Sequence, residues 1–272
     1  MIKKILITGA SGYLGRNLLK YFKKKNYHIS IISKKKIYGT TYLGNDLRNN
    51  NVDKSYKFDL IINCAAKGVY TKETKKDIYK VNYYDLLYFF KKLYSYGNFK
   101  WIFIGSAFEY GFIKDKALSA KYSELKPIDD YGKSKVKFYK KIKKIKLKKK
   151  FQILYLRLFH LYGGDEPQKR LYPSLIKSIN QNKNFEMSEA KELRDFIKIN
   201  SAIIKINKSL NYFSKKNNFF LTKHIATGKK TSVKNFAIKL WKKHKSKNKI
   251  FFNSIPKKGG YDSVYSDKVS LI

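Results

Sequence analysis

The stretch that decides the fold is ILITGASGYLG, residues 5–15, close to the start of the 272-residue chain. Its Ile-rich beginning is typical of a buried strand, and its glycines are Gly9, Gly12 and Gly15. A glycine turn between a strand and a helix lets the backbone approach a diphosphate, and the N–H groups that open the helix face its negative charge. The stretch therefore predicts a dinucleotide site at the beginning of an α/β fold.

Short apolar runs and longer amphipathic stretches alternate along the first half of the chain, which is typical of a parallel sheet with helices on both faces. The expected strands are Lys4–Ile7, His28–Ile32, Leu60–Cys64, Trp101–Gly105 and Gln152–Leu158. The expected helices are Leu14–Lys25, Ile78–Tyr96 and Ser134–Lys148. We therefore expect a Rossmann-type, doubly wound parallel sheet.

Beyond Leu161 the sheet pattern weakens, and we expect a smaller unit there. Its predicted elements are helices at Tyr172–Asn180, Asn200–Phe213 and Thr231–His244 and a strand at Phe219–Ala226. We expect residues 1–161 to form the dinucleotide-binding domain and residues 162–272 to form mainly a substrate-binding cap. Segments near 195–215 are expected to return to the first domain, so that the two units are interleaved.

The charge of the chain is strongly positive, with 61 Lys and Arg against 19 Asp and Glu and a formal net charge of +42. Such an excess suggests an anionic partner. Because the excess is nearly all Lys and is spread along the chain, while nucleic-acid readers rely on Arg for bidentate base contacts, we expect no nucleic-acid partner. A general attraction for anionic substrates is the expected consequence.

Cys64 is the only cysteine, and the four histidines are scattered, so the sequence predicts neither a disulfide framework nor a metal site. The apolar run at the N-terminus leads directly into the glycine turn and is too short for a signal peptide. No segment approaches the ~18 apolar residues of a membrane span. We therefore expect a cytoplasmic protein without a membrane span.

A candidate catalytic pair lies in Tyr131-Gly132-Lys133-Ser134-Lys135. The pattern Tyr-x-x-x-Lys occurs eight times in this Lys- and Tyr-rich chain, so the spacing alone carries little information. Only the copy at Tyr131 contains the Gly and Ser, follows a strand that ends near a serine, and begins a helix leading into another strand. The surrounding residues, and not the spacing, therefore make Tyr131 and Lys135 the candidate catalytic pair.

Tyr131 and Lys135 are four residues apart, which places them on one face of a helix. A phenol of pKa ~10 is a poor acid or base near neutrality. An ammonium about 4 Å away contributes about 4 kcal/mol at an effective dielectric near 20, enough to lower that pKa by about three units. The pair is therefore suited to proton transfer.

Several motifs together resemble the extended short-chain dehydrogenases/reductases, the NAD-dependent epimerase/dehydratase family. Asp46-Leu47-Arg48 and Asn63-Cys64-Ala65-Ala66 resemble its adenine-contacting and fourth-strand elements. The run from Ser106 to Gly111 resembles its Ser/Thr-x-x-x-Tyr-Gly motif. The runs 156–163 and 193–197 resemble its LRxFNxYGP and RDFIHVDD motifs.

The resemblance implies roles for individual residues. The catalytic residues would be Ser106, Tyr131 and Lys135. The cofactor would be held by Thr8, Gly9, Ser11, Gly12, Tyr13, Leu14, Gly15, Ser33, Lys34, Asp46, Leu47, Asn63, Ala65, Ala66, Asn82, Tyr131 and Lys135. The substrate would contact Ser106, Phe108, Tyr131, His160 and Arg194. Arg194 would bind the diphosphate of the substrate; the alternative is that it forms only an ion pair with a neighbouring residue.

The chain departs from the family pattern at informative positions. Ala107 and Phe108 stand where the 4,6-dehydratases carry Asp and Glu, which argues against dehydration. His160 replaces the usual Asn. Lys257 and Lys258 either replace a basic residue that closes over the diphosphate or belong to a solvated loop.

Ser33, followed by Lys34, stands where NAD-preferring members carry an acid for the ribose hydroxyls. A small hydroxyl beside cations suits the additional phosphate of NADP. We therefore expect NADP to be preferred over NAD, although lysine is so common here that the feature also occurs by chance.

The resemblance implies an enzyme whose substrate is a nucleotide-diphosphate sugar. The main hypothesis is NAD(P)H-dependent reduction of a 4-keto-6-deoxy sugar nucleotide in surface-polysaccharide synthesis. The alternatives are an NAD-dependent nucleotide-sugar epimerase and a non-catalytic protein that senses a dinucleotide or binds a polyanion. A homodimer is expected only through the resemblance.

Overall fold

The N-terminal stretch forms strand β1 (Lys4–Thr8), a glycine turn and helix α1 (Tyr13–Phe22), as predicted. The computed structural model describes residues 2–68, 73–97, 99–111, 116–145, 151–214, 218–256 and 263–272. Helix α1 continues only as a 3-10 turn (Lys23–Lys25), because Asn26 turns into the left-handed region at φ 48°. The predicted helix therefore ends at Phe22.

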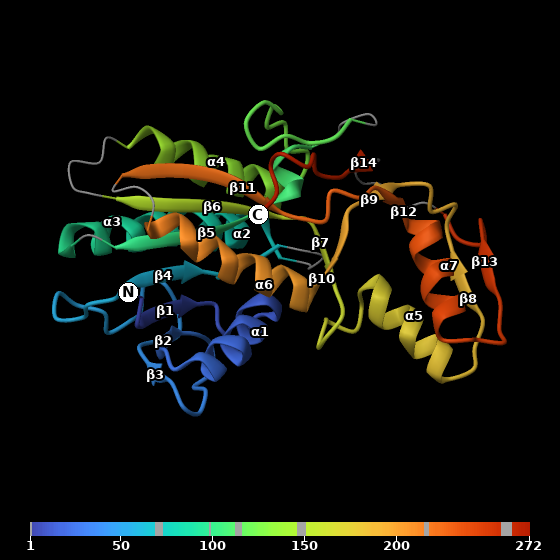
Figure 1. The fold of residues 1–272 in the computed structure, drawn as a ribbon, viewed down its shortest axis with the longest axis horizontal. Helices are drawn as coiled ribbons and strands as arrows, with labels where there is room; N and C mark the ends of the chain where they lie inside the picture. The colour runs from blue at the N-terminus through green and yellow to red at the C-terminus, as the bar shows by residue number, and fades with distance from the viewer. Residues whose placement is uncertain are drawn as a thin grey trace.

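A parallel sheet of seven strands forms the centre of the molecule, in the order β11-β6-β5-β4-β1-β2-β3 (Figure 1). The pairings place β4 and β2 on either side of β1. The remaining strands are β2 (His28–Ile32), β3 (Thr41–Tyr42), β4 (Leu60–Asn63), β5 (Lys100–Ser106), β6 (Gln152–Leu158) and β11 (Phe219–Ile225). The predicted Rossmann-type, doubly wound fold is confirmed.

Helices cover both faces of the sheet because successive strand residues point to opposite faces. Ile5 and Ile7 pack against α1 and α6 (Ile199–Ser209), whereas Leu6 belongs to the core under the other face. That face is covered by α2 (Lys75–Tyr79), a π turn (Lys80–Asp85), α3 (Leu86–Tyr96) and α4 (Asp130–Lys144).

Two predicted helices on this second face differ in detail from the structure. The helix expected at Ile78–Tyr96 begins earlier, at Lys75, because Thr74 caps it by accepting the N–H of Asp77, and the π turn interrupts it. The helix expected at Ser134–Lys148 begins at Asp130, because the Asp129 side chain caps it. Residues 146–148 of that prediction lie outside the described part of the chain.

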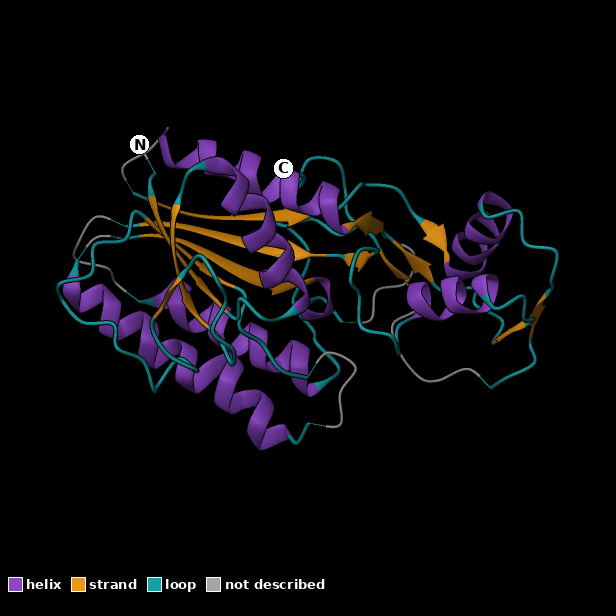
Figure 2. Cartoon of the chain, turned by 90° about the horizontal axis from the view of Figure 1, so that it is seen from below, coloured by secondary structure: helices purple, strands orange, loops and turns teal. Residues whose placement is uncertain are grey.

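A smaller unit lies beyond the carboxyl ends of the strands (Figure 2). Helices α5 (Leu171–Asn180) and α7 (Val233–Lys243) share an apolar core that includes Leu175 and Trp241. Its short strands are β7 (His160–Tyr162), β8 (Phe185–Met187), β9 (Leu193–Arg194), β10 (Phe196–Lys198), β12 (Thr231–Ser232), β13 (Ile250–Phe252) and β14 (Ser263–Val264).

The chain leaves the main sheet after β6 and returns to it with helix α6 and strand β11. Helix α6 packs on α1, and β11 pairs in parallel with β6 along its whole length. The smaller unit is therefore built from segments that lie on both sides of β11 in the sequence. Within the described residues, no helix has the length and apolar character needed to cross a membrane.

We expect Gly15→Ala to destabilise the protein strongly. A Cβ atom at Gly15 would lie 2.2 Å from the carbonyl oxygen of Gly9, so α1 could not keep its position against the turn. Overpacking of this kind costs about 1–3 kcal/mol, which a urea-unfolding midpoint measures. The matched control is Gly97→Ala, where the nearest atom is a Phe99 ring carbon at 3.8 Å. Equal midpoints for the two variants would contradict the role of this close approach.

Candidate functional site

Two adjoining cavities open at the carboxyl ends of the strands, on either side of the glycine turn. Cys64 and Ala66 line both. The first cavity brings together nine of the predicted cofactor residues: Gly9, Ser11, Gly12, Ser33, Lys34, Asp46, Leu47, Ala65 and Ala66. This edge of an open α/β sheet, where the connections diverge to the two faces, is the usual position for a ligand.

The glycine turn is shaped for close approach. Gly9 has φ +68° and donates its N–H to the carbonyl oxygen of Ile32 at 2.8 Å. A Cβ atom at this position would lie 2.6 Å from the backbone nitrogen of Ala65. Helix α1 begins directly after Gly12, and its first turn contains no acidic residue. Backbone N–H groups therefore face the cavity without a competing carboxylate, and a dinucleotide diphosphate fits this cradle.

Thr8, Asn63 and Asn82 support the cavity walls. The hydroxyl of Thr8 donates to Asn63 Oδ1 at 2.6 Å, while the buried Nδ2 of Asn63 has no hydrogen-bond partner among the described residues. Asn82, in the π turn, accepts the N–H of Lys67 and donates to Ser134 Oγ at 3.0 Å. Asn82 therefore ties the loop after β4 to helix α4.

Asp46 forms a tight turn at the rim of the first cavity. Its Oδ1 accepts the backbone N–H groups of Arg48 at 2.7 Å and Asn49 at 2.8 Å. Burial raises the pKa of the Asp46 carboxyl, but these hydrogen bonds outweigh it and hold the pKa below its usual value. The carboxylate is therefore fixed and ionised at this rim.

The second cavity is lined by all three predicted catalytic residues. It is lined by the predicted residues Tyr13, Leu14, Ser106, Phe108, Tyr131, Lys135 and His160. Gly15 lies behind the wall, where it lets α1 pack on the turn. Arg194 lies in β9 and donates to the carbonyl oxygen of Leu193 at 2.8 Å; it is not among the described residues that line this cavity.

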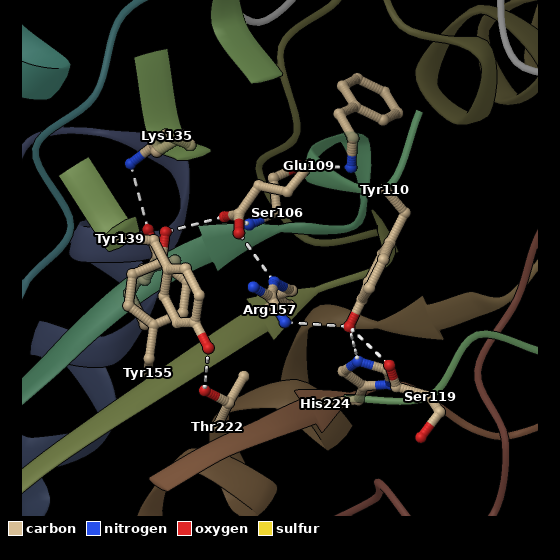
Figure 3. Close-up of polar contacts among 12 residues, drawn as sticks. Ser106, Glu109, Tyr110, Ser119, Lys135, Tyr139, Tyr155, Arg157, Thr222 and His224 are labelled. Carbon is tan, nitrogen blue, oxygen red and sulfur yellow. Dashed lines mark hydrogen bonds and ion pairs between the residues drawn. The ribbon is translucent and has the colours of Figure 1, made fainter. Parts of the chain in front are cut away.

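Ser106, at the end of β5, and Lys135, in the first part of α4, lie close together (Figure 3), and Tyr131 of α4 lines the same cavity. Ser106 Oγ accepts the N–H of Phe108 at 3.2 Å. Lys135 Nζ donates to the carbonyl oxygen of Ile104 at 3.0 Å and lies 5.8 Å from the centroid of the Tyr131 ring. Hydrogen bonds therefore hold Ser106 and Lys135, and the Tyr131 ring lies beside Lys135 on the same helix.

Burial governs the charge of Lys135, whose side chain is 2% exposed. Burial lowers the pKa of its ammonium to about 8, although Glu109 and Cys64 oppose the shift. The group is therefore charged at neutral pH and loses its proton only a little above it. An ammonium so close to a phenol favours the phenolate.

Phe108 and His160 form the opposite wall of the second cavity. Their rings lie 5.7 Å apart in an edge-on contact, and Phe108 contacts the Tyr131 ring in the same way at 6.3 Å. Burial, together with the charges of Arg194 and Arg170, lowers the pKa of His160 well below its usual value. His160 therefore presents a neutral imidazole, and its buried Nδ1 has no hydrogen-bond partner among the described residues.

The sequence indicates a loop at residues 163–167 but not that this segment borders the second cavity. Pro167 and Arg170 line it, and the loop is fastened to α1 because the Tyr13 hydroxyl donates to the carbonyl oxygen of Gly163 at 2.6 Å. Arg16 and Asp165 form an ion pair between the same segments. The cationic Arg170 stands in the run GGDEPQKR, which matches no motif that would have singled it out. Lys257 and Lys258 lie outside the described residues.

Comparisons with known proteins agree with this arrangement. The sequence model described as "NAD dependent epimerase/dehydratase family" matches residues 5–204. No curated protein matched the sequence. Among solved structures, a mutant form of the UDP-glucuronic acid 4-epimerase from Bacillus cereus, in complex with UDP-4-deoxy-4-fluoro-glucuronic acid and NAD, is 23% identical, with a TM-score of 0.79 over 97% of this chain and 90% of that chain.

Two further solved structures have the same fold. The UDP-N-acetylglucosamine 4-epimerase from Methanobrevibacter ruminantium M1, in complex with UDP-N-acetylmuramic acid, is 18% identical, with a TM-score of 0.81 over 98% of this chain and 89% of that chain. MoeE5, in complex with UDP-glucuronic acid and NAD, is 15% identical, with a TM-score of 0.81 over 98% of this chain and 91% of that chain.

The predicted preference for NADP is wrong, because the similar structures are complexes with NAD. The structure gives a physical reason. Ser33 is 2% exposed, and its Oγ accepts the N–H of Lys35 within its own loop at 3.5 Å. Ser33 is therefore buried and exposes little surface to an additional phosphate, and the lysines that follow belong to a chain in which lysine is common.

We expect the imidazole of His160 to stay neutral at pH 6.5, where an ordinary histidine is half protonated. An ordinary histidine titrates near pKa ~6.5, whereas a proton on this buried ring would face two arginines and lack solvation. Proton–carbon NMR of the histidine rings measures this, and His160→Gln assigns the resonance. A titration midpoint between pH 6 and 7 for the assigned ring would contradict the described environment.

Proposed function

The chain belongs to the NAD-dependent epimerase/dehydratase family, an enzyme family, and from this we propose that it is an NAD-dependent epimerase of a nucleotide-diphosphate sugar. One observation carries the proposal: Ser106, Tyr131 and Lys135 line a cavity that shares Cys64 and Ala66 with the cavity of the glycine turn. Groups for proton transfer at a sugar hydroxyl therefore lie beside a dinucleotide cradle.

The residues of the first cavity hold the cofactor. The backbone from Gly9 to Leu14 receives the diphosphate, Asp46 and Leu47 contact the adenine end, and Lys135 contacts the nicotinamide ribose. When bound, NAD supplies a group that accepts a hydride from a sugar carbon and returns it. Thr8, Asn63 and Asn82 act by holding the backbone that forms the cradle.

Tyr131 moves the proton. Its phenolate takes the proton of the sugar hydroxyl while the carbon is oxidised, and its phenol returns it during reduction. The ammonium of Lys135 stabilises the phenolate, and the carbonyl oxygen of Ile104 holds that ammonium in place. The hydroxyl of Ser106 donates a hydrogen bond to the reacting oxygen and stabilises the charge that develops there.

The substrate lies between the two units. We propose that residues 162–272 form mainly the substrate-binding cap and that His160 contacts the sugar from the wall of the second cavity. Arg194 is proposed to reach the diphosphate, for which a guanidinium is well suited. The carboxylates of a dehydratase are absent, because Ala107 and Phe108 stand in their places.

A second candidate is the reduction of a 4-keto-6-deoxy sugar nucleotide with NADH. The observation that favours it is the Phe108 ring, which lines the cavity beside Tyr131 and faces His160. An apolar wall of this kind suits the methyl group of a 6-deoxy sugar better than it suits a carboxylate. The same Ser106, Tyr131 and Lys135 would serve, with Tyr131 as the acid.

One assay separates the two candidates. The purified protein is denatured and the released nicotinamide dinucleotide is quantified, and the native protein is then incubated with UDP-glucose and UDP-glucuronic acid. Epimer formation without net change in absorbance at the NADH band supports the epimerase. Consumption of free NADH only when a 4-keto-6-deoxy sugar nucleotide is added would overturn it in favour of the reductase.

We expect Tyr131→Phe to lower kcat by about 10²–10⁴-fold, the usual contribution of a positioned acid–base group. The affinity for NAD, measured by isothermal titration, should change little because the ring remains. Tyr122→Phe is the matched control: it belongs to another Tyr-x-x-x-Lys copy, and its side chain is 77% exposed. Wild-type turnover in Tyr131→Phe would contradict the acid–base role of Tyr131.

A further inference from the structure

A buried carboxylate lies directly behind Ser106. Glu109 is 0% exposed, and its Oε1 accepts two hydrogen bonds at 2.8 Å, from the backbone N–H of Ser106 and from the hydroxyl of Tyr155 (Figure 3). Ser106 Oγ in turn accepts the N–H of Phe108. The reciprocal bonds form a capping box around the short 3-10 turn Ala107–Glu109.

The residues around the Glu109 carboxylate satisfy both of its oxygens with hydrogen bonds. Arg157, 1% exposed, donates from Nε to Glu109 Oε2 at 2.7 Å and from Nη1 to the hydroxyl of Tyr110 at 3.0 Å. Arg157 pairs in register with Gly105 across β5 and β6. A Cβ atom at Gly105 would lie 2.5 Å from Glu109 Oε1, so only glycine leaves room for the carboxylate against the strand.

The stability of the fold alone does not explain why Glu109 and Arg157 form a buried ion pair here. Removing two charges from water costs about as much as their attraction returns, and apolar residues of similar volume are often equally stable. The pair lies one hydrogen bond away from Ser106. On the basis of the proposed function, we propose that Glu109 is a positioning residue, which orients Ser106 and places its carboxylate behind the cavity that Lys135 lines.

The orientation of Ser106 follows from the hydrogen bonds. Its backbone N–H is committed to Glu109, and one lone pair of its hydroxyl is committed to Phe108. The hydroxyl proton is left to donate to an oxygen in the cavity. Without the carboxylate, the capping box opens and the serine is free to take other rotamers.

The charge of Lys135 also depends on the groups around it. The titratable groups that face it are Glu109 from the 3-10 turn, Cys64 from the end of β4 and Tyr131 from its own helix. Burial lowers the pKa of the ammonium, and Glu109 opposes that shift. A neutral residue at position 109 therefore lowers the pH at which Lys135 loses its proton.

Two substitutions separate the two effects. Glu109→Leu removes the acceptor, and we expect kcat to fall about 10- to 100-fold, as for small misplacements of a reacting group, with KM changed little. Glu109→Gln keeps an acceptor for Ser106 but removes the charge, so the alkaline limb of the kcat profile should move to lower pH. Glu124→Gln, at an exposed ion pair with Lys126, is the matched control and should change neither.

Folding is checked by circular dichroism before kinetics. If a single variant does not fold, the double variant Glu109→Gln/Arg157→Gln is measured in its place, because it leaves no unpaired buried charge. The proposal predicts that its alkaline limb also lies at lower pH. A wild-type profile in this double variant, or in Glu109→Gln, would overturn the positioning role.

The wild-type protein is measured first in the same assay, with UDP-glucose and UDP-glucuronic acid. No wild-type turnover of any nucleotide sugar would overturn the proposed function, and this inference with it. Wild-type turnover combined with unchanged kcat and pH profile in the Glu109 variants would overturn the positioning role alone.

Discussion

The buried ammonium of Lys135 is the feature on which the arrangement of the site depends. Removing such a charge from water costs several kcal/mol, and the protein must compensate for that cost. Here the carbonyl oxygen of Ile104 accepts a hydrogen bond from the ammonium, and the Glu109 carboxylate lies near enough to raise its pKa. Burial still prevails, and the pKa settles at about 8. The same contacts therefore keep Lys135 charged and join helix α4 to strand β5.

The second constraint is the contact between backbones at the glycine turn. Gly15 lets α1 lie against Gly9, and Gly9 lets the turn lie against the loop that follows β4. The parallel sheet then brings the ends of β1, β4 and β5 to one edge. A cradle for a diphosphate and a pair of groups for proton transfer meet there because strand order, not sequence proximity, decides which residues are neighbours.

The sequence predicted those parts of the fold and the site whose information is local. The glycine turn and the pair Tyr131–Lys135 each lie within a few residues, so turn chemistry or helix periodicity is enough to interpret them. The contact between Glu109 and Arg157 joins residues 48 positions apart and depends on the register of β5 against β6, which no pattern in either segment indicates. Strands β9 and β12 are two residues long, and β9 lies between β12 and β14, so these strands are defined by long-range pairing that a local pattern does not indicate. The cofactor preference drawn from Ser33 was wrong, because the sequence shows the residue but not that its side chain is buried.

The lysines of helix α4 show why composition is a poor guide to function in this chain. Lys135 is buried under the cavity, whereas Lys137, two residues later, is directed to the tyrosines of the neighbouring helical segment and lies 4.5 Å from the centroid of the Tyr83 ring. The two residues are chemically identical in the sequence. Their different roles follow from the face of the helix on which each lies, because successive residues are turned by about 100° around the axis. Net charge and lysine content therefore do not distinguish the lysine that lines the cavity from a lysine on the other face of the same helix.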